Sequence, residues 1–146
     1  MRISAKAEYA CVAMLELAAT YADNQPVRIK AIADAQGVPQ RFLVQILLQL
    51  KTAGLVASVR GASGGYQLAK PPDSVSLAAV INAIDDRTLG ARGDRTDPKL
   101  NRTPAVDALM SVWKEIQAEE QRLLANLSLA ELIRRTQLTN ALSYQI

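Results

Sequence analysis

The stretch from Val27 to Lys70 reads VRIKAIADAQGVPQRFLVQILLQLKTAGLVASVRGASGGYQLAK and contains four short segments with different patterns. In the first two, 28–36 and 39–53, apolar residues recur three and four positions apart, which predicts amphipathic helices. The last two, 55–59 and 66–69, flank a glycine-containing loop, which predicts a β-hairpin. Helix, turn, helix and hairpin in this order are typical of a winged helix-turn-helix, a unit that reads DNA.

The second of these helices has two distinct faces. It follows Gly37, a residue suited to a left-handed turn, and Pro39, which is predicted in its first turn. One face is predicted to enter the core and carries Leu43, Ile46, Leu47 and Leu50. The other face begins with Gln40, Arg41 and Gln45. Arginine can form paired hydrogen bonds to guanine and glutamine to adenine. A solvated helix face is the plainer interpretation of this helix alone, but the turn before it and the hairpin after it favour base reading.

The loop between the predicted strands, RGASGG over 60–65, places Arg60 at its mouth. A narrow loop that carries an arginine is suited to the minor groove of A·T-rich DNA. The loop is not a P-loop, because no Gly-Lys-Ser/Thr follows it. It contains G-x-x-G, as KH domains do, but in KH domains that loop joins two helices. A plain hairpin turn with no role in DNA binding is the remaining alternative.

The segments on either side complete one predicted domain over 1–84. Residues 4–22 are predicted to form a helix capped by Ser4 and packed on two sides. A second helix is predicted from Ser74 or Ser76 to Ala83 or Ile84, packing on the first. Residues 85–103 mix five basic with four acidic residues and carry glycines and a proline, which indicates a flexible loop or linker.

Residues 104–146 are predicted to form a long dimerisation helix and a short final one. The long helix is capped by Thr103 and is about 23 residues, or roughly 35 Å, too long to bury its apolar stripe against so small a domain. A second subunit is therefore expected to cover it, the alternative being a helix folded back on its own domain. The predicted interface residues are Val106, Leu109, Met110, Trp113, Ile116, Leu123 and Leu127. A capping box at 128–131 predicts a last helix to Arg135, followed by a frayed end.

Composition restricts the function further. The first 70 residues hold eight Lys and Arg against four Asp and Glu, so the basic excess lies in the predicted DNA-binding part. Cys11 is the only cysteine and there is no histidine. An intramolecular disulfide, a zinc finger and a His-dependent triad are therefore excluded within one chain, and no metal site is expected. No signal-peptide pattern and no long apolar run is present, so we expect a cytoplasmic protein without a membrane partner.

These residues resemble one bacterial family of dimeric winged-helix regulators. The matching stretches are RISAKAEYACVAMLELA, IADAQGVPQRFLVQILLQLKTAGLVASVRGASGGYQLAK and SLAAVINAID, which together span most of residues 2–86. The family includes an iron–sulfur cluster regulator, a nitric-oxide-sensing repressor and a cysteine-metabolism repressor. The resemblance implies a homodimeric repressor on a pseudo-palindromic site, with a recognition helix over 39–52 and a wing over 60–65. It also implies that Tyr9 and Phe42 lie near the DNA backbone.

One feature departs from this family. Cluster-binding members carry three cysteines in the loop before the long helix, whereas residues 85–103 hold none. Iron–sulfur ligation needs several thiolates or other donors held together, which one thiol per subunit cannot supply. We therefore expect no cofactor. The resemblance is to the clusterless branch, some members of which respond to a metabolite or to a partner enzyme, so a small-molecule or protein effector is possible here.

The sequence thus predicts a mainly α protein, a winged helix-turn-helix with a two-stranded wing and a long C-terminal dimerisation helix. Its expected function is specific binding of double-stranded DNA as a homodimer, and no catalytic residue is expected. Lys6, Lys51 and Ser63 are predicted to hold phosphates. The full predicted DNA-contacting set is Lys6, Tyr9, Pro39, Gln40, Arg41, Phe42, Gln45, Lys51, Arg60, Ser63 and Gly64. The alternatives are a winged-helix module for protein–protein contact and a regulator controlled by complex formation with a metabolic enzyme.

Overall fold

The computed structural model of the chain describes residues 3–85 and 99–144. Over these residues it is mainly helical, with a single two-stranded sheet. The elements are α1 (Ala5–Ala19), α2 (Ile29–Gln36), α3 (Gln40–Thr52), β1 (Val56–Val59), β2 (Gly65–Leu68), α4 (Leu77–Asp85), α5 (Pro104–Asn126) and α6 (Leu129–Tyr144). The winged helix-turn-helix fold is therefore confirmed. Most of the predicted linker, residues 86–98, lies outside the described residues.

Helix α1 is the centre of the N-terminal domain. It packs against α2, α3, α4 and β2, and its alanines allow those neighbours to approach closely. Ser4 caps it as predicted, since its Oγ accepts a hydrogen bond from the Ala7 N–H at 3.0 Å. The same hydroxyl donates to Asp85 Oδ1 at 2.6 Å, which ties the start of α1 to the end of α4. The helix is shorter than predicted, because a 3₁₀ turn at Tyr21–Asp23 follows it and ends with Asn24 at a φ of 52°.

The turn between α2 and α3 is built as the sequence indicates. Gly37 adopts a φ of 68°, a left-handed conformation in which a side chain would be strained. The predicted core face of α3, Leu43 with Ile46, Leu47 and Leu50, is completely buried. One boundary was wrong: Pro39 is the N-cap of α3 rather than a residue of its first turn. Its extended backbone places it just outside the helix.

The hairpin is antiparallel, with Val56 opposite Leu68 and Val59 opposite Gly65. The sequence did not predict a further bridge, in which Val27 and Tyr66 exchange two backbone hydrogen bonds of 2.8 Å. This bridge attaches the hairpin to the segment before α2. A Cβ at Gly64 would lie 2.2 Å from the Val59 carbonyl oxygen, so the tight turn requires glycine there. Packing of the hairpin alone is therefore enough to explain this glycine.

The C-terminal helices leave the domain from a single anchor. Backbone hydrogen bonds join Leu77 N–H to the Leu127 carbonyl at 2.8 Å and Leu129 N–H to the Val75 carbonyl at 2.9 Å. Leu129 is completely buried in the main core. Leu127, predicted within the interface stripe, lies just past the end of α5 as its C-cap residue. The start of α6 is therefore part of the N-terminal domain.

The last helix was predicted too short. Instead of ending near Arg135, α6 continues to Tyr144. No glycine or proline occurs in this stretch to stop it. The hydroxyls of Thr136 and Thr139 donate to the carbonyls of Leu132 and Arg135, each at 3.0 Å, so these residues are satisfied within the helix. Glu131 pairs with both Arg134 and Arg135 one turn further on.

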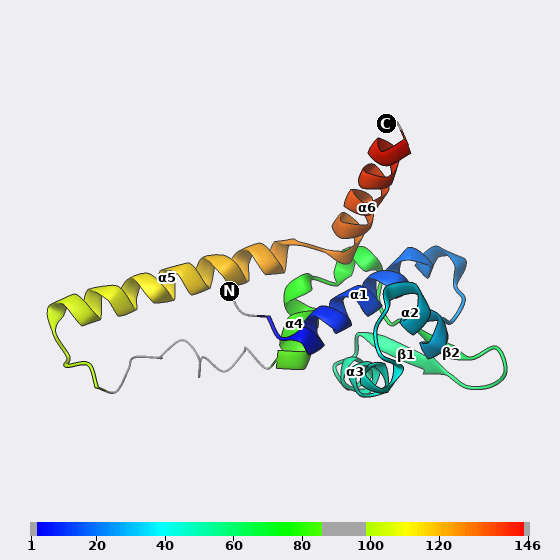
Figure 1. Cartoon of the computed structure of the whole chain (residues 1–146), viewed down its shortest axis with the longest axis horizontal. Helices are drawn as coiled ribbons and strands as arrows, with labels where there is room; N and C mark the ends of the chain where they lie inside the picture. The colour runs from blue at the N-terminus through cyan, green and yellow to red at the C-terminus, as the bar shows by residue number, and fades with distance from the viewer. Residues whose placement is uncertain (1–2, 86–98, 145–146) are drawn as a thin grey trace.

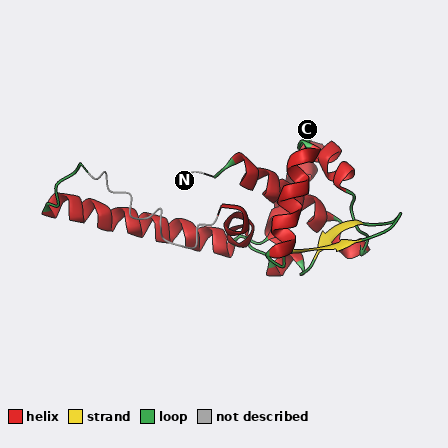
Figure 2. Cartoon of the chain, turned by 90° about the horizontal axis from the view of Figure 1, so that it is seen from below, coloured by secondary structure: helices red, strands yellow, loops and turns green. Residues whose placement is uncertain are grey.

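Helix α5 and the hairpin lie at opposite ends of the molecule. In Figure 1, α5 extends to one side of the domain while the hairpin projects at the other, and Figure 2 shows the same separation from below. Among the described residues no helix is both long and apolar enough to cross a membrane.

Candidate nucleic-acid interface

Helix α3 presents its polar face to solvent. Gln40, Arg41 and Gln45, the predicted base-reading residues, are all exposed and lie on the first turns of the helix. They are exposed because the opposite side of α3 is held in the core, which fixes the rotation of the helix. Lys51, at the far end, is also exposed, and its Nζ donates to the Ser58 hydroxyl at 2.8 Å. This bond links the end of α3 to β1.

Aromatic side chains support the start of α3. The Arg41 guanidinium carbon lies 4.9 Å from the centre of the Phe42 ring, a cation–π contact. The Phe42 ring is in turn 6.1 Å from that of Tyr9 on α1, at an interplanar angle of 31°. The structure thus brings three predicted site residues together. Arg41 packs on Phe42, and Phe42 packs on Tyr9 of α1.

The wing lies beside this face and has the same sign of charge. Arg60 and Ser63 are exposed, as expected for residues that contact DNA. Gly64 is buried and its N–H donates to the Gly61 carbonyl at 3.0 Å, so the structure gives it a role in the turn. Lys6, the remaining predicted phosphate contact, is half-buried on α1.

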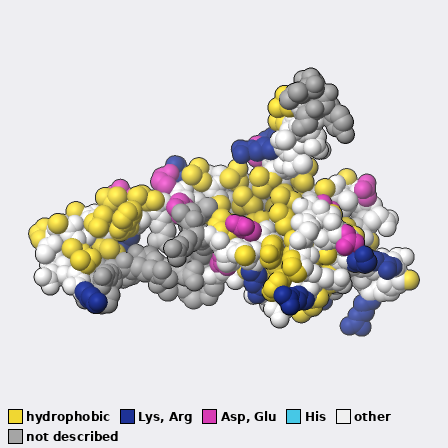
Figure 3. All heavy atoms as spheres, viewed as in Figure 1, with side chains coloured by type: hydrophobic (Ala, Val, Ile, Leu, Met, Phe, Trp, Pro, Cys, Tyr) yellow, Lys and Arg dark blue, Asp and Glu magenta, His cyan; other side chains and the backbone are white. Residues whose placement is uncertain are grey.

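The segment that contains α3 and the hairpin has no acidic residue. Between Asp34 and Asp73 the sequence has no Asp or Glu, while four Lys and Arg fall in the same interval. Figure 3 shows Lys and Arg side chains along the lower edge of the molecule, where α3 and the wing lie. A face without negative charge beside an arginine-bearing wing is electrostatically suited to a phosphate backbone.

Two apolar side chains interrupt the polar face. Val44 is 42% exposed and Leu48 is 52% exposed, although both lie on the solvent side of α3. From the sequence we gave neither residue a role. Their spacing from Arg41, three and seven residues, was the available signal, because it aligns all three along one side of the helix.

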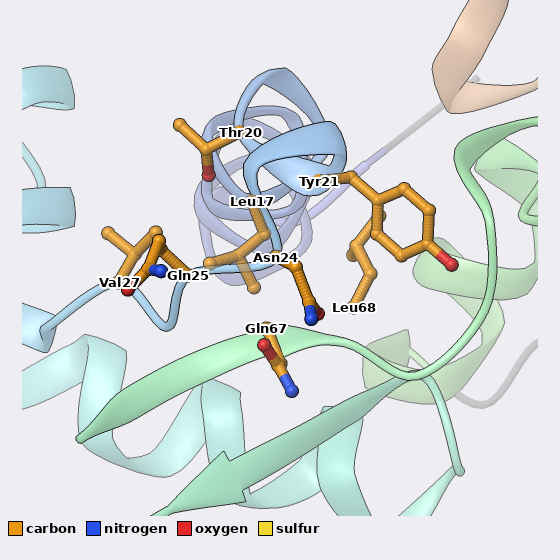
Figure 4. A pocket seen from close by; sticks show the side chains of 8 residues that line it. All are labelled: Leu17, Thr20, Tyr21, Asn24, Gln25, Val27, Gln67 and Leu68. Carbon is orange, nitrogen blue, oxygen red and sulfur yellow. The ribbon is translucent and has the colours of Figure 1, made fainter. Parts of the chain in front are cut away.

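A small pocket lies away from this face, between the end of α1 and β2. Its volume is about 100 Å³, and its lining consists of Leu17, Thr20, Tyr21, Asn24, Gln25, Val27, Gln67 and Leu68. Figure 4 shows these side chains, which come from the end of α1, the segment that follows it and β2. None of the lining side chains is charged, so the pocket has no group that would pair with a phosphate.

Cys11 is half-buried in α1 and is not arranged as a metal ligand. Burial above all, together with the negative charges of Glu8 and Asp85, raises the pKa of its thiol from the ordinary 9.0 to about 11. The thiol is therefore protonated at neutral pH. Within residues 3–85 and 99–144 no three His, Cys, Asp or Glu side chains are grouped closely enough to hold a metal ion.

Comparison with known proteins defines the class of the molecule. A family model for Rrf2, described as an iron-dependent transcriptional regulator, matches residues 3–135. An HTH-type transcriptional regulator of Mycobacterium tuberculosis is 42% identical over 132 residues, which cover 90% of this chain and 81% of that protein. The regulator IscR of Yersinia pestis is 34% identical over 135 residues, covering 91% of this chain and 79% of IscR.

Solved structures agree with this assignment. The global cysteine regulator CymR of B. subtilis superposes with a TM-score of 0.77 at 28% identity, covering 92% of this chain and 98% of CymR. IscR of T. potens superposes with a TM-score of 0.75 at 29% identity, covering 93% and 88% of the two chains. The chain belongs to the Rrf2 family of helix-turn-helix transcriptional regulators. It is a DNA-binding regulator, and the individual DNA contacts named above stay predictions.

The base-reading assignment predicts different results for two neighbouring cations. Arg41→Ala should relax the preference at one base pair by about 1–3 kcal/mol, because the side chain is assigned to a base edge. Lys51→Ala should weaken binding to all sequences alike and lower the salt dependence, because a phosphate contact carries no sequence information. Titration of both variants against a set of single-base operator changes measures this. An unchanged preference in Arg41→Ala would contradict the assignment.

The environment of Cys11 predicts slow reaction with alkylating agents. Only the thiolate reacts, so the rate of iodoacetamide labelling of the folded protein should keep rising with pH up to about 11. The chain unfolded in denaturant is the control, and its rate should level off near the ordinary thiol value. A folded-state plateau near pH 9 would show that the thiol is not desolvated.

Proposed function

We propose that the chain is a homodimeric repressor that binds an inverted-repeat operator and carries no iron–sulfur cluster. The observation that carries this proposal is the uncovered apolar stripe of α5. Its residues Leu109, Val112, Trp113, Ile116 and Leu123 are 45–61% exposed. In Figure 3 hydrophobic side chains gather on the outer part of this helix. Contiguous exposed apolar surface of this kind marks a protein interface.

The helix makes little contact with its own domain. Leu124, in its last turn, is its only buried side chain, and it packs against Ala7, Ala78 and Ile81. Its other side chains are exposed or half-buried, and the apolar residues named above are about half exposed. This exposure argues against the alternative of a helix folded back on the domain. Leu109, Ile116 and Leu123 recur every seven residues, the repeat that suits packing of two helices around each other. A second copy of this helix is the occupant that matches this repeat.

Dimerisation would define the operator. A two-fold symmetric dimer presents two α3 helices in opposite orientations, so its site is an inverted repeat whose half-sites lie about 34–36 Å apart, or a multiple of that distance. The anchor beside Leu77 and Leu129 joins the dimer helix directly to the domain core. Separation of the two reading helices is thus set by how α5 pairs. Occupation of such a site within a promoter would block transcription.

The donor set of the chain does not fit a cluster, although the family model is described as iron-dependent. A [2Fe–2S] or [4Fe–4S] centre takes four ligands, usually cysteine thiolates and sometimes histidine. Each subunit offers one half-buried thiol with a raised pKa, and no histidine at all. A regulator of this composition would take its signal from a small molecule or from a partner protein, such as a metabolic enzyme. No catalytic role is assigned to any residue.

A winged-helix module used only for protein contact is the second candidate. Its docking face would be expected to be largely apolar with a polar rim. Here the corresponding face combines Gln40, Arg41 and Gln45 with an arginine-bearing wing and lacks acidic residues from 35 to 72. These features favour DNA over protein as the ligand of α3.

The dimer proposal predicts a specific sensitivity of α5 to charge. Ile116→Glu should weaken self-association at least about 100-fold, because an unpaired charge buried at an interface costs about 3–5 kcal/mol. Ser111→Glu, a matched control on the opposite side of the same helix, should leave the dimer intact. Light scattering during size-exclusion chromatography measures both masses, and circular dichroism verifies folding. A dimer that survives Ile116→Glu at low concentration would contradict the assigned interface.

A further inference from the structure

We propose that Val44 reads thymine, by packing its two methyl groups against the C5-methyl of one thymine in each half-site. The inference rests on the proposed role of α3 as the helix that lies in the major groove. It adds an apolar contact to the polar base contacts assigned to Arg41 and Gln45. A T·A pair at one defined position of the half-site follows from it.

The position of Val44 on α3 carries this inference. Arg41, Val44 and Leu48 lie three and four residues apart and form one row along the exposed face. Val44 is 42% exposed, whereas the core residues beside it in sequence, Leu43 and Ile46, are completely buried. Val44 is therefore not a displaced core residue. It points to the same side as the residues that the sequence assigns to base edges.

The chemistry of the groove selects the partner. Hydrogen-bonding atoms occupy the major-groove edges of all four bases, and the thymine C5-methyl is the one apolar group among them. An apolar side chain inserted there gains only where it covers that methyl. Contact with the polar atoms of the other bases would leave their hydrogen bonds unmade. Valine is also β-branched and stiff in a helix, so ordering it on DNA costs little conformational entropy.

Val44 is better placed for this contact than Leu48. Recognition helices contact bases mainly with their N-terminal residues, and Val44 is the fifth residue of α3, whereas Leu48 lies one turn further on. The surroundings also favour DNA as the partner. Arg41 in this row, Lys51 at the end of α3 and Arg60 on the wing are exposed, and no acidic residue lies on α3 or the hairpin.

The test uses uracil, which pairs with adenine as thymine does but lacks the C5-methyl. Each thymine of the selected operator is replaced in turn by uracil, symmetrically in both half-sites, and binding of the full chain is titrated at low salt. At one position the wild type should bind the uracil duplex about four-fold more weakly per half-site than the thymine duplex, the value expected for one methyl group removed from water.

Val44→Ala should bind the thymine duplex more weakly than the wild type does. At that position its affinities for the thymine and uracil duplexes should differ by less than about two-fold.

Leu48→Ala is the matched control, since it shortens the next apolar side chain of the same row. It should keep the wild-type ratio at the position read by Val44. Thermal unfolding verifies that both variants fold, as expected for exposed positions. A wild type that shows no preference for thymine over uracil at any position would overturn the proposal. So would a Val44→Ala variant that keeps the wild-type ratio, or a ratio lost equally in Leu48→Ala.

The outcome separates this inference from the proposed function. A chain that selects an inverted repeat but does not distinguish uracil from thymine retains its function and loses only the valine contact. A chain that selects no sequence at all, or selects one without any effect of α3 substitutions, contradicts the proposed function itself. Either of these last two results would indicate that Val44 and Leu48 contact a protein partner instead of DNA.

Discussion

Burial of one side of α3 is the constraint on which the reading face depends. Leu43, Ile46, Leu47 and Leu50 leave no exposed surface, and they pack beneath α1, whose own buried side is rich in alanine. A close-packed core of this kind permits one rotation of the helix. That rotation places Arg41, Val44 and Gln45 outward together. The exposure of these predicted DNA-contacting side chains is therefore a consequence of apolar packing on the opposite side of the same helix.

The same reasoning connects the domain to the dimer helix. Hydrogen bonds between the start of α4 and the segment after α5, together with the buried Leu129, attach the C-terminal part to the core through a short junction. Leu124 extends this attachment by one turn. Before that turn α5 has no fully buried side chain. The pairing of two such helices would then be transmitted to the spacing of two reading faces, because few flexible residues intervene between them.

Much of the fold could be predicted from the sequence because its signals are local. The left-handed Gly37, the Ser4 and Thr103 caps and the apolar periodicity of α3 each depend on residues within a few positions. The bridge between Val27 and Tyr66 could not be predicted, since it joins segments about forty residues apart and has no side-chain signature. The length of α6 was missed because its threonines, asparagine and serine are weak helix formers. The threonine hydroxyls are satisfied inside the helix in a way that composition does not indicate.

The site residues divide in the same way, into those with a local sequence signal and those that depend on tertiary structure. Arg41, Gln45 and Arg60 were found because their chemistry suits DNA, and the structure leaves them exposed. The stack of Arg41 on Phe42 and Tyr9 required tertiary structure, since α1 and α3 are separate in sequence. Val44 received no role because an apolar residue on a mixed helix gives no functional signal until its exposure is known.

The most direct test of the account is selection of bound duplexes from a random pool by the purified chain, performed with and without an iron chelator. We expect two inverted half-sites separated by about one helical turn or a multiple of it, recovered equally under both conditions. A single unpaired half-site, no enriched sequence, or enrichment that is lost when iron is removed would contradict the account of a clusterless dimeric regulator.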